Sequence, residues 1–315
     1  MTTAHSDDVA VSARGVTFRY GERVACKDLE FEVARGGVHA FLGPNGSGKS
    51  TLFKVLSTVY PMQDGDVRIL GSDLRSGVAA IRERIGVVFQ SPALDGKLSV
   101  RENLVYGGHL YGLSGAELNR RIDEMLANTG LTDRSKDNVA ALSGGLRRRV
   151  ELAKGLLSKP DLVLLDEPST GLDPGARHDL WRFLGSLEGL TVLFTTHLMD
   201  EAERADDVTI LSEGSIVAAG KPADLVRSIG SQVLEVACAD PEVLAPKLAA
   251  RLGVEPIVLE RSLRVQRDDA HKLVPDVIDG FGDEVETVAV SHPSLEDVFI
   301  QATGHRFWGD EEGAS

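Results

Sequence analysis

Hydrophobic residues along this chain form short unbroken runs, separated by polar and glycine-rich stretches. The runs with the length of a single strand are residues 38–42, 85–89, 162–165 and 190–196. Continuous apolar runs are typical of strands buried on both faces of a parallel sheet. The segments 11–20 and 23–33 instead alternate apolar and polar residues around a Gly21-Glu22 turn, which predicts two antiparallel strands. We therefore expect an α/β protein that contains both kinds of sheet.

Residues 91–158 follow a different pattern, because apolar positions recur there at the spacing of a helix. Segments 98–112 and 115–128 are predicted helices, and the region ends in a predicted helix from Arg147 to Leu157. We expect this region to be a mainly helical insert between two strand-rich halves of a domain that spans residues 11–228.

The pattern restarts after Gly230, where predicted strands and helices follow in the order βαββαβ, with a last helix at 294–303. This order predicts a small split-βαβ domain over residues 230–304. It carries no nucleotide or metal motif, and we interpret it as a packing or regulatory module. A chain of 315 residues is long enough for two such domains.

The strongest chemical pattern is the stretch GPNGSGKST, which lies between a predicted strand and a predicted helix and fits the P-loop spacing. Its glycines let backbone N–H groups point at phosphate oxygens, and the following helix N-terminus adds positive potential. Lys49 is expected to contact the outer phosphates, and the Ser50 hydroxyl to bind Mg²⁺. The predicted nucleotide-binding residues are Gly43, Pro44, Asn45, Gly46, Ser47, Gly48, Lys49, Ser50 and Thr51.

Polar residues follow three of the apolar runs directly, where ligands bind in doubly wound sheets. Asp166 and Glu167 follow one run: Asp166 suits holding a metal through water, and Glu167 suits accepting a proton from an attacking water. His197 follows another and suits a hydrogen bond to a terminal phosphate. Gln90 either points into the same crevice or only caps its strand.

Three further features have two interpretations each. Ser143-Gly144-Gly145 begins a predicted helix and is either a second anion-binding terminus or a simple N-cap. Tyr20 either stacks on a purine base or is an ordinary half-buried strand residue. The run 147–149, three arginines, also fits a solvated helix face.

Composition limits the partners of the chain. The formal charge is −14, from 34 basic and 48 acidic residues, which argues against a protein that coats nucleic acid. Cys26 and Cys238 lack metal-ligand spacing, and we interpret both as small buried apolar side chains. No apolar run reaches the length of a membrane span, and the first residues lack a signal-peptide core. We expect a soluble chain that reaches a membrane only through a partner.

Taken together, the motifs resemble those of the ATP-binding cassette (ABC) transport ATPases over residues 15 to about 225. The matching positions are Tyr20 (adenine-stacking aromatic), Gly43–Thr51 (Walker A), Gln90 (Q-loop), Leu142–Leu146 (LSGGQ signature), Asp166 and Glu167 (Walker B aspartate and catalytic glutamate), Ser169–Asp173 (D-loop) and His197 (switch histidine). Leu146 stands where the family has glutamine, so a contact made by that amide is missing here.

This resemblance implies a P-loop NTPase cassette with a RecA-like core, an antiparallel β subdomain and a helical insert, followed by the small α+β C-terminal domain. It implies ATP hydrolysis with Mg²⁺. Glu167, His197 and Lys49 are then catalytic, and the metal is held by Ser50, Gln90 and Asp166.

The resemblance also implies a head-to-tail dimer of two copies, with ATP between the Walker A loop of one copy and the other copy's Ser143, Gly144 and Gly145, close to Asp173. A separately encoded membrane permease would hold the dimer at the cytoplasmic face. We expect Ser91–Ser99, including Leu94 and Leu98, to receive a helix of that permease, because this segment connects Gln90 to the insert.

The arginine run and the segment 293–299 (PSLEDVF) resemble the drug-export branch of daunorubicin-resistance type, which implies export. The alternative function is a soluble cassette ATPase that acts on ribosomes or DNA. Such members usually carry two cassettes and basic linkers, whereas this chain has one cassette and a net negative charge.

Overall fold

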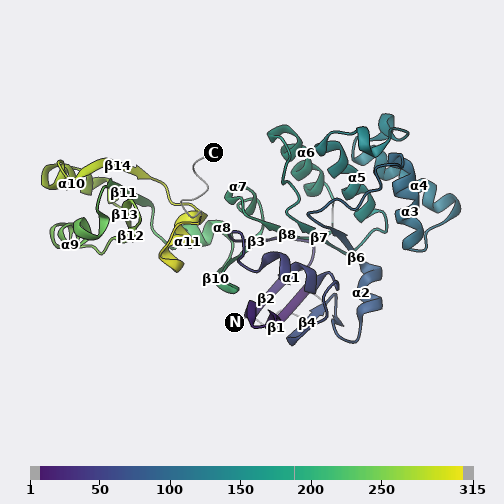
Figure 1. The fold of residues 1–315 in the computed structure, drawn as a ribbon, viewed down its shortest axis with the longest axis horizontal. Helices are drawn as coiled ribbons and strands as arrows, with labels where there is room; N and C mark the ends of the chain where they lie inside the picture. The colour runs from purple at the N-terminus through teal and green to yellow at the C-terminus, as the bar shows by residue number, and fades with distance from the viewer. Residues whose placement is uncertain (1–7, 188, 308–315) are drawn as a thin grey trace. The chain divides into compact units, whose positions relative to one another are not determined.

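The structure is a computed structural model that describes residues 8–187 and 189–307 (Figure 1). It forms two compact units. The first comprises the described residues up to His197 together with 213–215, and the second comprises 198–212 and the residues from 216 onward. All residues proposed above for nucleotide, metal and catalysis fall in the first unit.

The first unit contains an antiparallel sheet in the strand order β2-β1-β4-β5. Its strands are β1 (Val9–Tyr20), β2 (Arg23–Ala34), β4 (Asp64–Ile69) and β5 (Ser72–Asp73). The predicted pairing is confirmed, since β1 and β2 run antiparallel from Val9 opposite Ala34 to Tyr20 opposite Arg23. In β2, buried Phe31 and Val33 alternate with exposed Glu30 and Glu32, as the period-two pattern predicts.

The first unit also contains a parallel set of strands in the order β3-β8-β7-β6. These strands are β3 (Val38–Leu42), β6 (Ile85–Val88), β7 (Leu162–Asp166) and β8 (Thr191–Thr196). Every residue of β7 and β8 is buried, which explains the apolar runs 162–165 and 192–194 within them. Leu42 pairs with Thr196, and Asp166 pairs with Thr195, so these strands end at one common edge.

Helices surround the strands of the first unit (Figure 1). Their bounds are α1 (Lys49–Leu56), α2 (Val78–Arg84), α3 (Val100–Leu110), α4 (Gly115–Asn128), α5 (Gly144–Leu156) and α6 (Pro174–Gly185). Helix α1 contacts β2 as well as β7 and β8, so it packs between the two sheets. Helices α3, α4 and α5 contact one another and form the predicted helical insert.

Helix α5 begins at Gly144, three residues before the predicted start at Arg147. The Ser143 hydroxyl accepts a hydrogen bond from the Leu146 amide at 3.4 Å, so the two glycines belong to the first turn. Helix α5 also lies very close to β6, because a Cβ added to Gly86 would be only 2.2 Å from the Gly155 carbonyl oxygen. Only glycine at position 86 therefore allows this approach without a backbone shift.

The second unit contains an antiparallel sheet in the order β12-β13-β11-β14. The helices and strands of the chain from Met199 onward are α7 (Met199–Ala202), β9 (Asp207–Ser212), β10 (Ser215–Gly220), α8 (Pro222–Arg227), β11 (Gln232–Cys238), α9 (Pro241–Leu252), β12 (Ile257–Leu259), β13 (Ser262–Arg267), α10 (Val274–Phe281), β14 (Val285–Ser291) and α11 (Leu295–Thr303). Strand β13 lies between β11 and β12, so the two strands joined through α9 are not neighbours in the sheet.

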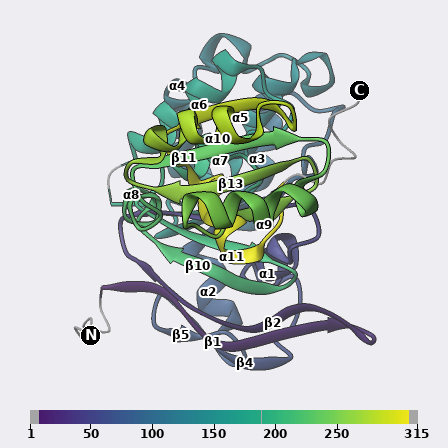
Figure 2. The same ribbon diagram turned by 90° about the vertical axis from the view of Figure 1, so that its left-hand side faces the viewer.

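One face of this second sheet is covered by α9 and α10 (Figure 2). Leu234 and Leu263 from the sheet pack there against Leu248 of α9 and Val277 of α10. Cys238 belongs to the same core, and Cys26 is buried in the first unit, as expected for small apolar side chains. Burial raises the pKa of Cys26 to about 12.

Candidate active site

The loop after β3 has a backbone that glycine makes possible. Gly46 and Gly48 have φ angles of 83° and 101°, a left-handed region that other residues rarely adopt. A Cβ on Gly48 would lie 2.4 Å from the Ala25 carbonyl oxygen, so strand β2 leaves no space for a side chain there. Gly48 is the N-cap of α1, which directs the free N–H groups of the first helical turn into this loop.

Lys49 closes the same loop with its side chain. Its Nζ donates hydrogen bonds to the carbonyl oxygens of Gly43 at 2.7 Å and Pro44 at 3.0 Å. Burial lowers the pKa of Lys49, while the nearby carboxylates of Glu167 and Asp166 act in the opposite direction. The ammonium group is thus held at the loop and faces two acidic side chains.

Asp166 ends β7 and is almost completely buried. Its Oδ1 accepts a hydrogen bond of 2.6 Å from Thr195 Oγ1, and the Glu167 amide donates to the same Thr195 oxygen at 3.0 Å. Burial raises the pKa of Asp166, because the charged form loses its hydration. Thr195 therefore orients both acidic residues, a role that sequence analysis missed although Thr195 interrupts an otherwise apolar run.

Glu167 is the point at which three separate segments meet. Its Oε1 lies 3.2 Å from Nδ1 of His197 after β8, and its Oε2 accepts from Gln90 Nε2 at 3.0 Å and Thr170 Oγ1 at 3.1 Å. The contact with His197 lowers the pKa of Glu167 below its ordinary value, so the carboxylate is ionised at neutral pH. Glu167 also adopts a φ of 45°, a strained conformation for a non-glycine residue.

A pocket of about 290 Å³ joins these groups. Its lining includes Tyr20, Arg23, Ala25, Asn45, Gly46, Gly48, Lys49, Ser50, Thr51, Gln90 and Glu167. The Tyr20 hydroxyl lies 3.3 Å from Thr51 Oγ1, and 45% of the Tyr20 residue is exposed. Its ring also makes an edge contact with Phe18. This position favours the base-stacking interpretation of Tyr20 over an ordinary strand residue.

Seven of the predicted nucleotide-binding residues are not among the residues that line this pocket. Gly43, Pro44 and Ser47 still belong to the loop beside it, whereas the other four lie elsewhere in the first unit. Ser143 and Gly144 are exposed at the start of α5, and a Cβ on Gly144 would come nearest to the Gly171 carbonyl oxygen, at 3.9 Å. Gly145 lies beside Ala176 of α6. Asp173 caps α6 by accepting a hydrogen bond from the Ala176 amide at 3.0 Å. The structure thus places these four residues together, but outside the pocket.

Arg148 is a second residue that sequence analysis misjudged. It belongs to an arginine run that fits a solvated helix face, yet only 8% of its side chain is exposed. Its guanidinium donates to carbonyl oxygens next to Gln90 and around Glu167. Glu151, three residues later on the same helix, was the signal available in the sequence, because a buried arginine needs a charge partner.

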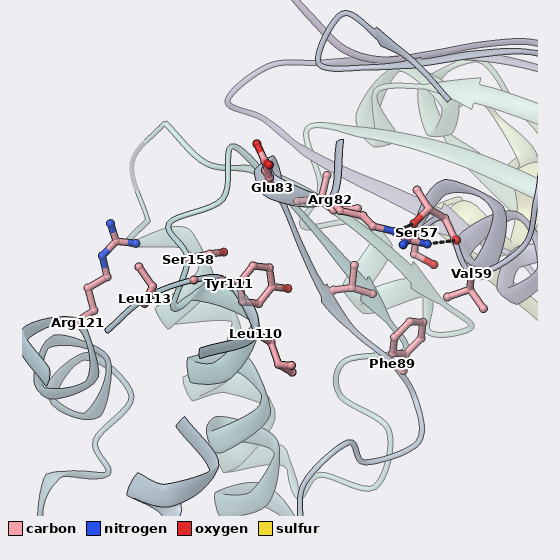
Figure 3. A pocket seen from close by; sticks show the side chains of 14 residues that line it. Ser57, Val59, Arg82, Glu83, Phe89, Leu110, Tyr111, Leu113, Arg121 and Ser158 are labelled. Atoms are coloured by element: carbon pink, nitrogen blue, oxygen red, sulfur yellow. Dashed lines mark hydrogen bonds between the residues drawn. The ribbon is translucent and has the colours of Figure 1, made fainter. Parts of the chain in front are cut away.

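A larger pocket of about 890 Å³ lies elsewhere in the first unit (Figure 3). Leu110 and Tyr111, at the end of α3, lie on one side of it, and Val59 and Phe89 lie on the other. Leu110 is 84% exposed, which is unusual for so large an apolar residue. None of the residues 91–99 lines this pocket, so the expected docking segment and this apolar pocket are different surfaces.

The described residues show no membrane span and no preformed metal cage. Among the described helices, none combines the length and apolar character that crossing a membrane requires. Within residues 8–187 and 189–307, no three His, Cys, Asp or Glu side chains gather into a metal-binding group.

The chain shows clear similarity to known proteins along most of its length. Residues 26–170 match the family described as ABC transporter. The daunorubicin resistance ATP-binding protein DrrA3 of Streptomyces coeruleorubidus is 37% identical over 305 residues, which cover 94% of this chain and 96% of that protein. The Nod factor export ATP-binding protein I of Rhizobium meliloti (strain 1021) is also 37% identical, over 300 residues that cover 94% of this chain and 88% of that protein.

Solved structures support the same assignment. An ATP-binding subunit of an ABC transporter has a TM-score of 0.63 and 31% identity, over 70% of this chain and 92% of that chain. The cbiO1 protein of Clostridium perfringens, part of the ABC transporter complex cbiONQ, has a TM-score of 0.65 and 29% identity, over 78% and 96%. A cassette solved as a dimer with ADP and Pi has a TM-score of 0.62 and 27% identity, over 67% and 98%.

The predicted cassette fold and the predicted family are confirmed by these similarities. The glycine loop, the paired acidic residues and the histidine also lie close together in the first unit, in contact through Lys49 and Glu167. The chain belongs to the ABC transporter family as an ATP-binding, ATP-hydrolysing subunit, in the branch that contains the daunorubicin-resistance and Nod factor export ATP-binding proteins.

Proposed function

We propose that this chain powers an exporter by hydrolysing ATP at the pocket beside the P-loop, in a dimer attached to a separate membrane permease. The observation that carries the proposal is the position of Glu167. This ionised carboxylate is held by Gln90, Thr170 and His197 from three segments, next to the loop that Lys49 closes.

The nucleotide would lie along the pocket from Tyr20 to Glu167. The exposed ring of Tyr20 supplies a stacking surface for adenine, which is worth about 1–3 kcal/mol. The backbone N–H groups of Gly43–Thr51 bind phosphate oxygens at the N-terminus of α1. Lys49 exchanges its two loop carbonyls for the outer phosphates, so its charge is compensated with or without a ligand.

The residues present fit a magnesium ion. Ser50 and Gln90 line the pocket, and Asp166 lies at the end of β7, so the available ligands are a hydroxyl, an amide and a carboxylate oxygen. Hard oxygen ligands of this kind, completed by phosphate and water, are what Mg²⁺ prefers. When bound, the ion neutralises charge on the phosphates.

Glu167 is the proposed general base, and His197 positions it. The contact with His197 lowers the pKa of the Glu167 carboxylate, which is ionised at neutral pH and can accept a proton from a water that attacks the terminal phosphate. The imidazole can then hydrogen-bond the same phosphate. Thr195 keeps the backbone of Glu167 fixed during this step.

Two copies of the chain are proposed to form a head-to-tail dimer. Ser143, Gly144, Gly145 and Asp173 lie together outside the pocket, and the exposed start of α5 carries free N–H groups suited to phosphate. These residues can contact a nucleotide only if that nucleotide is bound in the pocket of a second copy. A solved relative of this fold is a dimer with ADP and Pi, which supports the arrangement.

The permease is proposed to dock on the pocket lined by Leu110, Tyr111, Val59 and Phe89, in preference to Ser91–Ser99. A pocket of this size that combines these apolar side chains with the charged Arg82, Glu83 and Arg121 suits one amphipathic helix from a membrane partner. Phe89 immediately precedes Gln90, so movement of the docked helix can reach the catalytic hydrogen bond directly. The permease would hold the chain at the cytoplasmic face of the membrane.

Two other assignments follow the same proposal. Residues 11–228 form the ATP-binding domain and 230–304 a small accessory domain, supported by the separate core of the β11–β14 sheet. Action on ribosomes or DNA is disfavoured, because export subunits match 94% of this chain and its formal charge is −14.

Lys49→Ala is expected to abolish ATP turnover, because it removes the charge that faces the outer phosphates. Equilibrium binding of a fluorescent ATP analogue should weaken by about tenfold or more, the equivalent of roughly 1.4 kcal/mol. Lys136→Ala, at an exposed lysine, is the matched control and should leave both measurements unchanged. Normal turnover in Lys49→Ala would contradict the assignment of this loop.

Glu167→Gln is expected to retain ATP binding and to lose turnover by roughly a hundredfold or more, because glutamine cannot accept the proton. The variant should accumulate as a dimer in size-exclusion chromatography with ATP and magnesium. Glu30→Gln, at an exposed glutamate, should behave like the unchanged protein. A Glu167→Gln variant that stays monomeric at high protein concentration would count against the head-to-tail dimer.

Leu110→Glu is expected to prevent co-purification with the permease subunit of the same transporter and to stop transport. ATP binding by the isolated chain should not change, since Leu110 is already 84% exposed. Val243→Glu, at an exposed apolar residue of the second unit, is the control. If Leu94→Glu blocks association while Leu110→Glu does not, the permease docks on Ser91–Ser99 instead.

A further inference from the structure

We propose that Arg148 is a positioning residue for hydrolysis, which holds the backbone on both sides of the hydrogen bond between Gln90 and Glu167. The inference rests on the catalytic role proposed for Glu167. Arg148 does not itself line the nucleotide pocket and acts through residues that do.

The guanidinium of Arg148 has every N–H donor engaged. Its Nε donates to the Pro168 carbonyl at 2.7 Å, and its Nη2 to the carbonyls of Asp166 at 3.1 Å and Glu167 at 3.3 Å. Its Nη1 donates to the Phe89 carbonyl and to Glu151 Oε2, both at 2.7 Å. An arginine has five N–H donors in a rigid planar fork, so its hydrogen-bonding capacity is filled.

The carbonyl groups that Arg148 binds belong to the two segments that form the site. Three are consecutive residues at the end of β7, including the strained Glu167 at φ 45°. A non-glycine residue in this conformation costs about 1–3 kcal/mol and persists only where its surroundings hold it. Three carbonyl dipoles that converge on one cation provide such a restraint. The fourth carbonyl, of Phe89, fixes the residue directly before Gln90.

The same face of α5 holds the other side of the Gln90 segment. Glu151 Oε1 accepts from the Ala93 amide at 3.0 Å, and Lys154 Nζ donates to the Ala93 carbonyl at 2.7 Å. Arg148, Glu151 and Lys154 are spaced three residues apart, so they form one row along the helix. These three side chains hydrogen-bond the backbone before Gln90, at Phe89, and after it, at Ala93. Because α5 begins next to Ser143, the hydrogen bonds of these three side chains link the start of the helix to the Gln90 segment and to the Glu167 backbone.

The Arg148–Glu151 ion pair by itself does not explain the arrangement. Both side chains are almost fully buried, with 8% and 7% exposure, and such a pair contributes little net stability compared with apolar residues of similar size. What only arginine supplies is the planar fork that reaches four carbonyls in two segments. Lysine keeps the charge but has one nitrogen, which cannot span them.

Loss of this fork is expected to lower kcat with little change in KM for ATP. The P-loop and Tyr20 do not depend on Arg148, so ground-state binding is preserved, whereas the Glu167 carboxylate is displaced from the attacking water. A misplacement of about 1 Å can cost about a hundredfold in rate. The expected loss in kcat is therefore about 10–100-fold, with KM within about threefold of the starting value.

The test compares three variants of the full chain: Arg148→Lys, the double variant Arg148→Met with Glu151→Met, and the control Arg149→Met. The double variant removes the buried charges together but also removes the hydrogen bonds to four carbonyls and to the Ala93 amide, so its unfolding midpoint should fall. Its kcat is measured at a temperature where it is folded, and should stay low there. Arg149 makes a surface ion pair with Asp179, and its variant should keep full kcat. Full kcat in the double variant or in Arg148→Lys overturns the proposal, as does loss of folding in Arg148→Lys.

Hydrogen–deuterium exchange separates this proposal from the role of Glu167. Arg148→Lys should speed exchange in segments 85–95 and 162–172, and Arg149→Met should not. This readout does not need turnover. Suppose that Glu167→Gln keeps full turnover while Arg148→Lys speeds exchange in both segments. The assigned base is then wrong, but the restraint by Arg148 holds. Unchanged exchange in both segments overturns the restraint even when Glu167→Gln is inactive.

Discussion

The burial of two adjacent carboxylates at the end of β7 is the constraint on which the rest of the site depends. Asp166 and Glu167 follow a fully buried strand, where a charged group loses most of its hydration. The structure compensates the lost hydration of the two carboxylates in different ways. Asp166 accepts one hydrogen bond from the Thr195 hydroxyl and its pKa is raised by burial, whereas the contact with His197 lowers the pKa of Glu167. One fold thus prepares neighbouring carboxylates for a metal ion and for a proton.

The remaining parts of the first unit follow from this constraint. Lys49 supplies positive charge on one side, and the glycine loop before it turns the N-terminus of α1 toward the same space. Arg148 supplies positive charge from behind, where it meets main-chain carbonyls and not the carboxylates themselves. The close approach of β6 and α5 at Gly86 brings that arginine within reach. Packing, electrostatics and the position of the catalytic groups are therefore coupled through a few backbone contacts.

The sequence predicted the features whose causes are local. The apolar runs predicted the buried strands, the glycine spacing predicted the loop before α1, and the bounds of α4 were predicted at both ends. The burial of Arg148 was not predictable from its run of arginines, because its acceptors are carbonyls about 20 and 59 residues away. Likewise the pocket beside Leu110 combines segments distant in sequence, so it was not predictable from any one of them. Non-local contacts of this kind leave no periodic pattern.

The central claim is that Glu167 is an ionised base whose pKa is lowered by its contact with His197. The most direct measurement is the ¹³C chemical shift of the Glu167 carboxyl group, followed against pH in the full chain and in His197→Ala. We expect the pKa of Glu167 to lie below its ordinary range in the unchanged chain and to rise when the imidazole is removed. A pKa above that range in the unchanged chain, or one that His197→Ala leaves unaltered, would contradict this account.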